Sequence, residues 1–149
     1  MIKRYSSAVA TRPDPALTEE IGRGIMRARR LILKEASHRL EQQGESLLVW
    51  QVLNALDRCG PGTQSELAAG TGHHPTGLSR LLEEMERAAL VRRKRDAADR
   101  RKVRVNSTAA GKKLWRAGRP AVVAAVEQVI APLGMGERRT LRDLLQRIV

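Results

Sequence analysis

Two short segments that alternate apolar and basic residues, Leu90–Lys94 and Lys102–Asn106, most restrict the fold of this chain. A period of two is typical of a strand with one buried face. The residues between the segments, Asp96–Arg101, are polar and favour a turn. The pattern therefore predicts a β-hairpin, in a chain whose other apolar patterns have helical spacing.

The same hairpin concentrates positive charge. The chain of 149 residues has a net charge of +12, and residues 92–104, with eight basic and two acidic side chains, carry half of it. Residues 1–91 are nearly balanced, with 12 basic and 11 acidic side chains. Charge gathered in one short segment indicates contact with a polyanion. The alternative is a solvated, disordered basic loop.

Two helices joined by a short turn precede the hairpin. Thr63 and Glu66 have the spacing of a capping box, and a turn follows at Thr71–His73. His74 is the predicted N-cap of a second helix that begins at Pro75 and has an apolar face formed by Leu78, Leu81, Leu82, Met85 and Ala89. This helix-turn-helix, followed by a basic hairpin, is a winged helix.

On the N-terminal side, residues 1–13 are expected to form a flexible arm. Asp14-Pro15 then begins an amphipathic helix of roughly 25 residues, which ends at Gln42-Gln43-Gly44. Ser46 is the expected cap of a second helix, apolar nearly all round and so expected to be buried, which ends at Gly60-Pro61-Gly62.

On the C-terminal side, Thr108 is the expected cap of another amphipathic helix. Gly118-Arg119-Pro120 should kink or interrupt that helix. A last helix is expected from Gly136, with an apolar stripe. We therefore predict a mainly α fold with a small β-hairpin (α+β).

Composition excludes several classes of protein. No apolar run approaches the ~20 residues of a membrane span, and the N-terminus has no signal peptide, so we expect a cytoplasmic protein without membrane contact. Cys59 is the only cysteine, which excludes an intrachain disulfide and a Cys-rich zinc site. The aromatic residues are only Tyr5, Trp50 and Trp115, too few for the stacking platforms of a single-strand binder.

No set of residues predicts catalysis. The adjacent His73 and His74 cannot both turn to one metal from a regular helix, and no third ligand lies near them in the sequence. The acidic cluster Glu83, Glu84 and Glu86 belongs to one helix face. We therefore predict no enzyme activity, no cofactor and no metal site.

A set of residues in the helix-turn-helix and hairpin matches a known family: Ser65-Glu66-Leu67-Ala68, Pro75-Thr76, Leu78-Ser79-Arg80-Leu81, Met85-Glu86, Leu90-Val91, Arg93, Asp96, Asp99-Arg100-Arg101, Val103, Val105, Thr108 and Gly111. With these residues the sequence resembles the MarR family of bacterial transcriptional regulators over nearly its whole length. The acidic-x-Arg pattern followed by Thr-x-x-Gly is the most specific part. Three residues depart from the pattern. Thr71 stands where the family usually has a buried aliphatic residue, Ala89 where it has a helix-terminating Gly, and Ser107 where it has a Leu.

The resemblance implies an intertwined homodimer that binds a palindromic DNA duplex. Residues 14–44 and 108–149 would form the dimerisation helices, and residues 45–107 the winged helix-turn-helix lobe. A long first helix and two apolar-striped terminal helices agree with this expectation. The alternative is a compact monomeric helical domain.

The second helix of the helix-turn-helix is expected to enter the major groove by its N-terminal half, which exposes Thr76, Gly77, Ser79 and Arg80. Arg80 is predicted to contact guanine, unless it binds phosphate or pairs with Glu83 or Glu84. At the start of the preceding helix, the backbone N–H groups of Thr63, Gln64 and Ser65 are expected to bind phosphate. His74, the N-cap of the second helix, is also expected to lie at the DNA.

In the hairpin, the resemblance implies that Arg101 reaches the minor groove and that Asp99 holds it there. A narrow minor groove attracts a guanidinium because it concentrates negative potential. Phosphate contacts are expected from the other basic residues, about half of which should be bystanders because strand side chains alternate: Arg92, Arg93, Lys94, Arg95, Arg100, Lys102 and Arg104.

Many members of the family bind a small aromatic or phenolic effector between their two lobes. If this chain does so, the candidate lining residues are Met26, Arg30, His38, Trp50 and Trp115. The alternative is that the two tryptophans and Met26 belong to the core. Cys59 is expected to be a small buried thiol and not a redox sensor.

Together these features predict a sequence-specific regulator that binds double-stranded DNA as a homodimer, as a repressor released by an effector. The alternative function is a nonspecific or architectural nucleic-acid-binding protein that uses the same basic hairpin.

Overall fold

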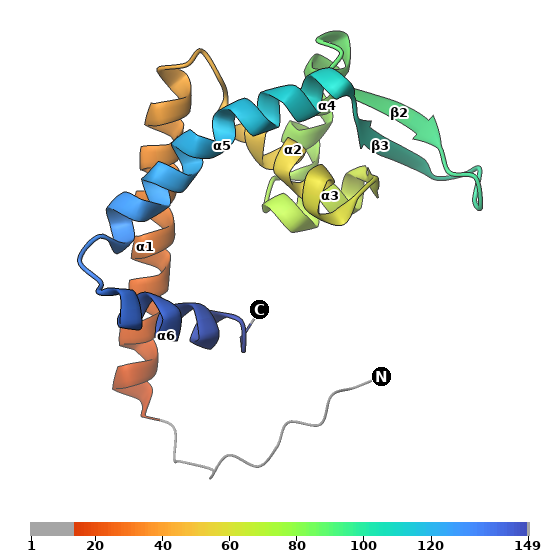
Figure 1. The fold of residues 1–149 in the computed structure, drawn as a ribbon. Helices are drawn as coiled ribbons and strands as arrows, with labels where there is room; N and C mark the ends of the chain where they lie inside the picture. Colours follow the sequence, from red (N-terminus) through yellow and green to blue (C-terminus); the bar gives the residue numbers. More distant parts are fainter. Residues whose placement is uncertain (1–13, 149) are drawn as a thin grey trace.

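A computed structural model describes residues 14–148 and shows a mainly helical chain with a small sheet. The flexible arm predicted for residues 1–13 lies outside the described residues. Figure 1 shows the elements in chain order: α1 (Pro15–Glu41), α2 (Leu47–Cys59), β1 (Gly62–Thr63), α3 (Gln64–Thr71), α4 (Pro75–Arg87), β2 (Val91–Arg95), β3 (Val103–Ser107), α5 (Ala109–Ile130) and α6 (Met135–Leu145).

The predicted hairpin is present as β2 and β3, in a three-stranded antiparallel sheet of order β1-β3-β2. Val91 and Val105 are buried against the helices, whereas Val103, further out along the hairpin, is 45% exposed. The hairpin therefore projects beyond the core, as Figure 1 shows. We call residues 91–107 the wing. Strand β1 was not predicted, because two residues carry no alternating pattern; Gly62 pairs with Val105 there.

One apolar core joins the helix-turn-helix to the wing. Its fully buried side chains come from α2, α3, α4 and both long strands, and include Val52, Leu53, Leu67, Leu78, Leu82, Met85, Val91 and Val105. The apolar face predicted for the second helix of the motif thus faces this core. Ala89 is the exception: it follows α4 and is exposed.

The Thr-x-x-Gly motif at the start of α5 has a packing role. Thr108 Oγ1 accepts a hydrogen bond from the Gly111 backbone N–H at 3.0 Å and donates to the Ala89 carbonyl oxygen at 2.7 Å. A Cβ atom on Gly111 would lie 2.2 Å from the Leu90 carbonyl oxygen. Only glycine therefore lets α5 pack this closely on the turn that follows α4.

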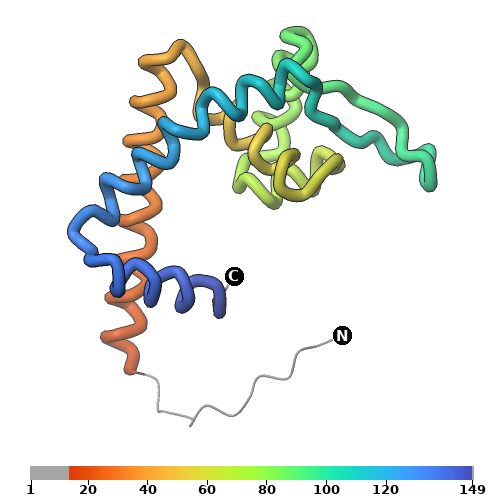
Figure 2. The backbone as a smooth tube through the Cα atoms, viewed as in Figure 1, coloured from red at the N-terminus to blue at the C-terminus, as the bar shows by residue number. Residues whose placement is uncertain are grey.

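Long helices carry the chain away from this lobe. Helix α5 runs from the wing across α2 to α1, and α6 follows it at the C-terminal end of the chain (Figure 2). Arg39 on α1 donates to Gln128 on α5 at 2.8 Å. Of the kink or interruption expected at Gly118-Arg119-Pro120, the interruption does not occur, because α5 is helical throughout. Leu114 and Trp115 at its start pack against the winged-helix core, so α5 belongs to both parts of the chain.

Most of the predicted helix starts are confirmed. Asp14 caps α1, accepting from the backbone N–H groups of Ala16 and Leu17, and Thr63 and Glu66 form the expected capping box. Ser46 occupies the N-cap position of α2, but its side chain makes no capping bond. The last helix begins one residue earlier than predicted, at Met135, where the Glu137 carboxylate accepts from the Gly134 N–H.

The terminal helices expose a large apolar surface. Helix α6 has no buried residue. The predicted apolar stripe of Leu141, Leu144, Leu145 and, just beyond the helix, Ile148 is 36–67% exposed. On α1, the first half exposes Leu17, Ile21, Ile25 and Met26 by 45–68%. Exposed apolar area of this kind is typical of an interaction surface. None of the helices in the described part of the chain is long and apolar enough to span a membrane.

Candidate nucleic-acid interface

The turn between α3 and α4 places one end of α4 at the surface. Gly72 ends α3 in the left-handed conformation (φ 71°), and His74 is the N-cap of α4, its Nδ1 accepting from the Thr76 N–H. Thr71, which departs from the family pattern, donates its hydroxyl to the Leu67 carbonyl oxygen at 2.6 Å. Its polar group is thereby satisfied within α3.

The N-terminal half of α4 is open to solvent on one side. Thr76, Gly77 and Arg80 are exposed and Ser79 is half-buried, while Leu78 faces the core. Arg80 makes no ion pair with any residue of the described part of the chain, so the pairing with Glu83 or Glu84 considered from the sequence is absent there. Thr63, Gln64 and Ser65 lie at the start of α3, and Gln64 donates to the Pro75 carbonyl oxygen at 3.4 Å.

At the wing tip, two aspartates organise the turn. Asp96 accepts from the backbone N–H groups of Ala98 (2.7 Å) and Asp99 (3.2 Å). Asp99 accepts from the backbone N–H of Arg101 at 3.1 Å and pairs with its Nε at 3.2 Å. The Arg101 side chain is nonetheless 92% exposed. Asp99 thus orients the Arg101 guanidinium at the wing tip and leaves most of it accessible to a ligand.

Arg104 has a structural position on β3, between the wing tip and β1. Its Nε donates to Asp96 Oδ2, and its Nη1 donates to the Pro61 carbonyl oxygen at 2.8 Å. The hydrogen bond from Arg104 lowers the pKa of Asp96 to about 2, and the pair raises the pKa of Arg104. Arg104 is therefore engaged within the fold, which argues against the phosphate contact expected of it.

Arg93 is also engaged. Its backbone N–H donates to Glu86 Oε1 at 3.0 Å, and its Nη1 pairs with Glu86 Oε2 at 2.9 Å. From the sequence we expected Arg93 to contact phosphate and Glu86 to belong to an acidic helix face. Sequence reasoning missed the link between them because it joins a helix to a strand across a turn, at a spacing that neither period predicts.

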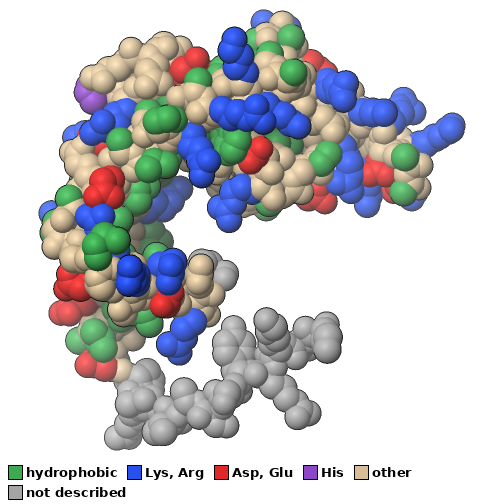
Figure 3. Space-filling model, viewed as in Figure 1, with side chains coloured by type: hydrophobic (Ala, Val, Ile, Leu, Met, Phe, Trp, Pro, Cys, Tyr) green, Lys and Arg blue, Asp and Glu red, His purple; other side chains and the backbone are tan. Residues whose placement is uncertain are grey.

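The remaining basic residues of the wing are exposed and make no ion pair with other described residues; they are Arg92, Lys94, Arg95, Arg100 and Lys102. Figure 3 shows Lys and Arg side chains gathered along the arm that Figure 1 labels β2 and β3. This charged arm and the open half of α4 belong to one lobe.

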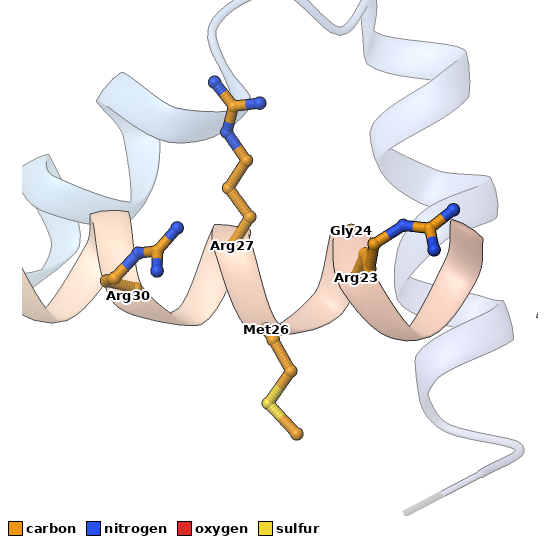
Figure 4. A pocket seen from close by; sticks show the side chains of 5 residues that line it. All are labelled: Arg23, Gly24, Met26, Arg27 and Arg30. Atoms are coloured by element: carbon orange, nitrogen blue, oxygen red, sulfur yellow. The ribbon is translucent and has the colours of Figure 1, made fainter. Parts of the chain in front are cut away.

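The five candidate effector residues do not meet in one hollow of the chain. Met26 and Arg30 line a shallow hollow on α1 with Arg23, Gly24 and Arg27, and Figure 4 shows Met26 and Arg27 pointing to opposite sides of the helix. His38 is exposed near the end of α1, with its Nε2 3.0 Å from that of Gln42.

Both tryptophans have core positions. Trp50 is buried and donates its Nε1–H to the Trp115 carbonyl oxygen at 3.1 Å, and Trp115 donates to Asn54 at 3.2 Å. The core alternative therefore describes the tryptophans, but not Met26, which is 68% exposed.

A different hollow lies between α1, α2 and the end of α3. It has a volume of about 510 Å³, and its lining includes the cationic Arg29 and Arg58 beside the apolar or amide groups of Leu33, Trp50, Gln51 and Asn54. Only Trp50 among these was a sequence candidate. Cys59 also lines this hollow and is exposed, so the prediction that its thiol is buried is wrong. The position follows from the end of α2, where the helix leaves the core.

Comparison with known proteins assigns this architecture. Residues 40–102 match the sequence model of the MarR family, which covers the helix-turn-helix and most of the wing. AbsC, a MarR family transcriptional regulator from Streptomyces coelicolor, is 26% identical, with a TM-score of 0.70 over 93% of this chain and 95% of that chain. Residues 40–102 therefore resemble the MarR family, and the chain shares the fold of solved members of that family.

Other solved structures agree. A probable transcriptional regulator from Pseudomonas aeruginosa is 27% identical, with a TM-score of 0.70 over 89% of this chain and 99% of that one. A MarR family protein of Mycobacterium tuberculosis in complex with salicylic acid is 25% identical, with a TM-score of 0.74 over 87% of this chain and 96% of that one. No curated protein matches the chain. The fold is that of MarR-family transcriptional regulators, which supports regulation through DNA binding.

Proposed function

We propose that the chain is a homodimeric, sequence-specific regulator that binds double-stranded DNA and represses transcription until an effector releases it. The observation that carries the proposal is that one lobe exposes two different DNA-reading groups. The open half of α4, with Arg80 unpaired within the described chain, fits a major groove, and the oriented Arg101 of the wing fits a minor groove.

The exposed apolar faces of α1 and α6 support the dimer. Residues 14–44 and 108–149 would supply the dimerisation helices, and residues 45–107 the DNA-binding lobe. Two lobes related by a two-fold axis would read a palindrome whose half-sites lie one helical turn apart.

The contacts proposed for DNA are those that the fold leaves available. Arg80, Ser79, Thr76 and Gly77 would face base edges, and Arg101 would enter the minor groove. Phosphates would be bound by the starts of α3 and α4, at Thr63, Gln64, Ser65 and His74, and by the free wing cations Arg95, Arg100 and Lys102. Arg93 does not belong to this set, because its guanidinium pairs with Glu86.

Selection of binding sites from a random-sequence duplex library tests this function. The regulator should enrich a palindrome and bind it roughly 10³-fold or more tightly than unrelated duplex at the same salt concentration. A ratio near one would instead favour the architectural protein, since the same basic wing would then act through phosphates alone.

The effector proposal rests on the hollow between α1, α2 and α3. Arg29 and Arg58 would attract an anion, and the Trp50 and Leu33 side chains would pack on an apolar ring. The M. tuberculosis relative was crystallised with salicylic acid, an aromatic carboxylate of this kind. We therefore propose an aromatic carboxylate as the effector class for this chain.

Salicylate provides the test of this proposal. Binding to the protein should be measurable by calorimetry and should be lost in Arg58→Ala, while Arg27→Ala, outside the hollow, should retain it. Because coupling between two ligands is reciprocal, salicylate must also weaken DNA binding. Salicylate binding that leaves DNA affinity unchanged would contradict the release mechanism.

A further inference from the structure

One carboxylate links the two DNA-reading elements of the lobe. Glu86 lies in the last turn of α4, which ends at Arg87, and Arg93 lies in the middle of β2. Glu86 Oε1 accepts from the Arg93 backbone N–H at 3.0 Å, while Oε2 pairs with the Arg93 guanidinium at 2.9 Å. The carboxylate therefore holds both the backbone and the side chain of the strand.

This link acts further out along the wing than the contacts of Thr108 and Val91. Thr108 binds the carbonyl oxygens of Ala89 and Leu90, and Val91 is buried in the core. Those contacts anchor the point where the wing begins. Arg93 lies two residues beyond Val91, opposite Val105, which also pairs with Gly62 of β1. Among the described residues, the Glu86 contact is the one at this level that joins the wing directly to α4, so it can influence the angle at which the hairpin leaves that helix.

We propose that Glu86 is a positioning residue that sets the angle between α4 and the wing, so that both can engage their grooves at once. The inference rests on the DNA-binding function proposed above. Glu86 and Arg93 are partly exposed (39% and 30%), and ion pairs so placed contribute little to global stability. The pair instead affects geometry. A misaligned wing keeps all its DNA-binding side chains but cannot bring them to their groove while α4 occupies its own.

Electrostatics and positioning predict opposite results for the same substitution. Glu86→Gln removes a negative charge from a surface that faces a polyanion, so electrostatics alone would tighten DNA binding. Positioning predicts weaker binding, because the amide of Gln cannot hold the guanidinium as an ion pair. Glu84→Gln is the matched control: it lies on the same helix, is exposed, and makes no ion pair with other described residues.

The experiment measures affinity for the palindrome selected by the wild-type protein, at several salt concentrations. We expect Glu86→Gln to bind about tenfold more weakly and Glu84→Gln to bind as well as or better than wild type. Melting curves of both variants should stay close to wild type, which separates positioning from unfolding. Glu86→Gln binding at least as tightly as Glu84→Gln would overturn the proposal.

A double-mutant cycle shows whether Glu86 acts through the wing. In an Arg101→Ala background the wing keeps only its phosphate contacts, so Glu86→Gln should cost clearly less affinity than in the wild-type background. An equal loss in both backgrounds would overturn the wing-positioning role. Should wild type itself select no palindrome, the DNA-binding proposal has failed instead, and the two failures are thereby distinguished.

Arg93→Ala supplies an independent readout. If Arg93 braces the wing, its loss should lower affinity while the slope of log K against log salt stays at the wild-type value. A slope reduced by about one would mean that Arg93 binds a phosphate directly, and that Glu86 is not its partner in the complex.

Discussion

At the residue scale, Ala89 is the one described residue other than glycine with a positive φ, at 55°. It follows α4 where the family usually has glycine. A Cβ atom in the left-handed region costs about 1–2 kcal/mol relative to the right-handed one. We expect Ala89→Gly to raise the free energy of unfolding by about 1 kcal/mol, measured by urea denaturation, because relief of strain exceeds the entropy lost by glycine.

The neighbouring residue gives the control for that substitution. Ala88 has a φ of −79°, which any residue adopts readily. Ala88→Gly should therefore lower stability by about 0.5–1 kcal/mol, since it adds only backbone entropy to the unfolded chain. Equal effects of the two substitutions would contradict strain at position 89.

Asp96 predicts how the wing responds to acid. Arg104 is the main cause that lowers the pKa of this carboxyl from 3.8 to about 2, and the backbone N–H groups of Ala98 and Asp99 add to the effect. The stabilisation is complete above the unfolded value and is lost as pH falls from about 4 through 2. Carboxyl NMR titration should show this midpoint, and Arg104→Ala should return it toward 3.8. A midpoint near 3.8 in the wild type would contradict the pair.

At the scale of elements, the wing carries the sharpest prediction for binding. Arg101→Ala should weaken binding to the selected palindrome by about 1–3 kcal/mol, because it removes the oriented guanidinium at the tip. Arg116→Ala is the control: it removes the same charge from an exposed position on α5 and should change affinity much less. Equal losses in fluorescence-anisotropy titrations would mean that total charge, and not the wing, governs affinity.

The elements also show what local pattern predicts. Caps such as Asp14, Thr63 and Thr108 were predicted because a capping bond joins residues two or three apart in the sequence. The long helices and the hairpin followed from their periods. Strand β1 was not predicted, because its pairing partner β3 is distant in the sequence. Helix α5 continues through Pro120, where an interruption was one of the two outcomes expected.

At the scale of the whole molecule, the exposed stripe of α6 predicts the state of assembly. Leu144→Glu should shift the protein from dimer to monomer in sedimentation velocity, because it places a charge within an apolar interface. Gln146→Glu adds the same charge at the exposed C-cap of α6, outside the apolar stripe, and should leave the dimer intact. A wild-type chain that is monomeric at all concentrations would contradict the dimer.

The sequence by itself determined the order of helices, the hairpin and its charge, and the wing aspartates and arginines, because periods, caps and composition act over a few residues. Only the tertiary structure decided which cations are free. Arg93 and Arg104 look like Arg92 and Arg95 in the sequence, yet the fold pairs the first two with Glu86 and Asp96. It also placed Arg29, Arg58 and Cys59 around one hollow. The physical reason is that ion pairs and hollows depend on which elements pack together, and this is a property of the whole core.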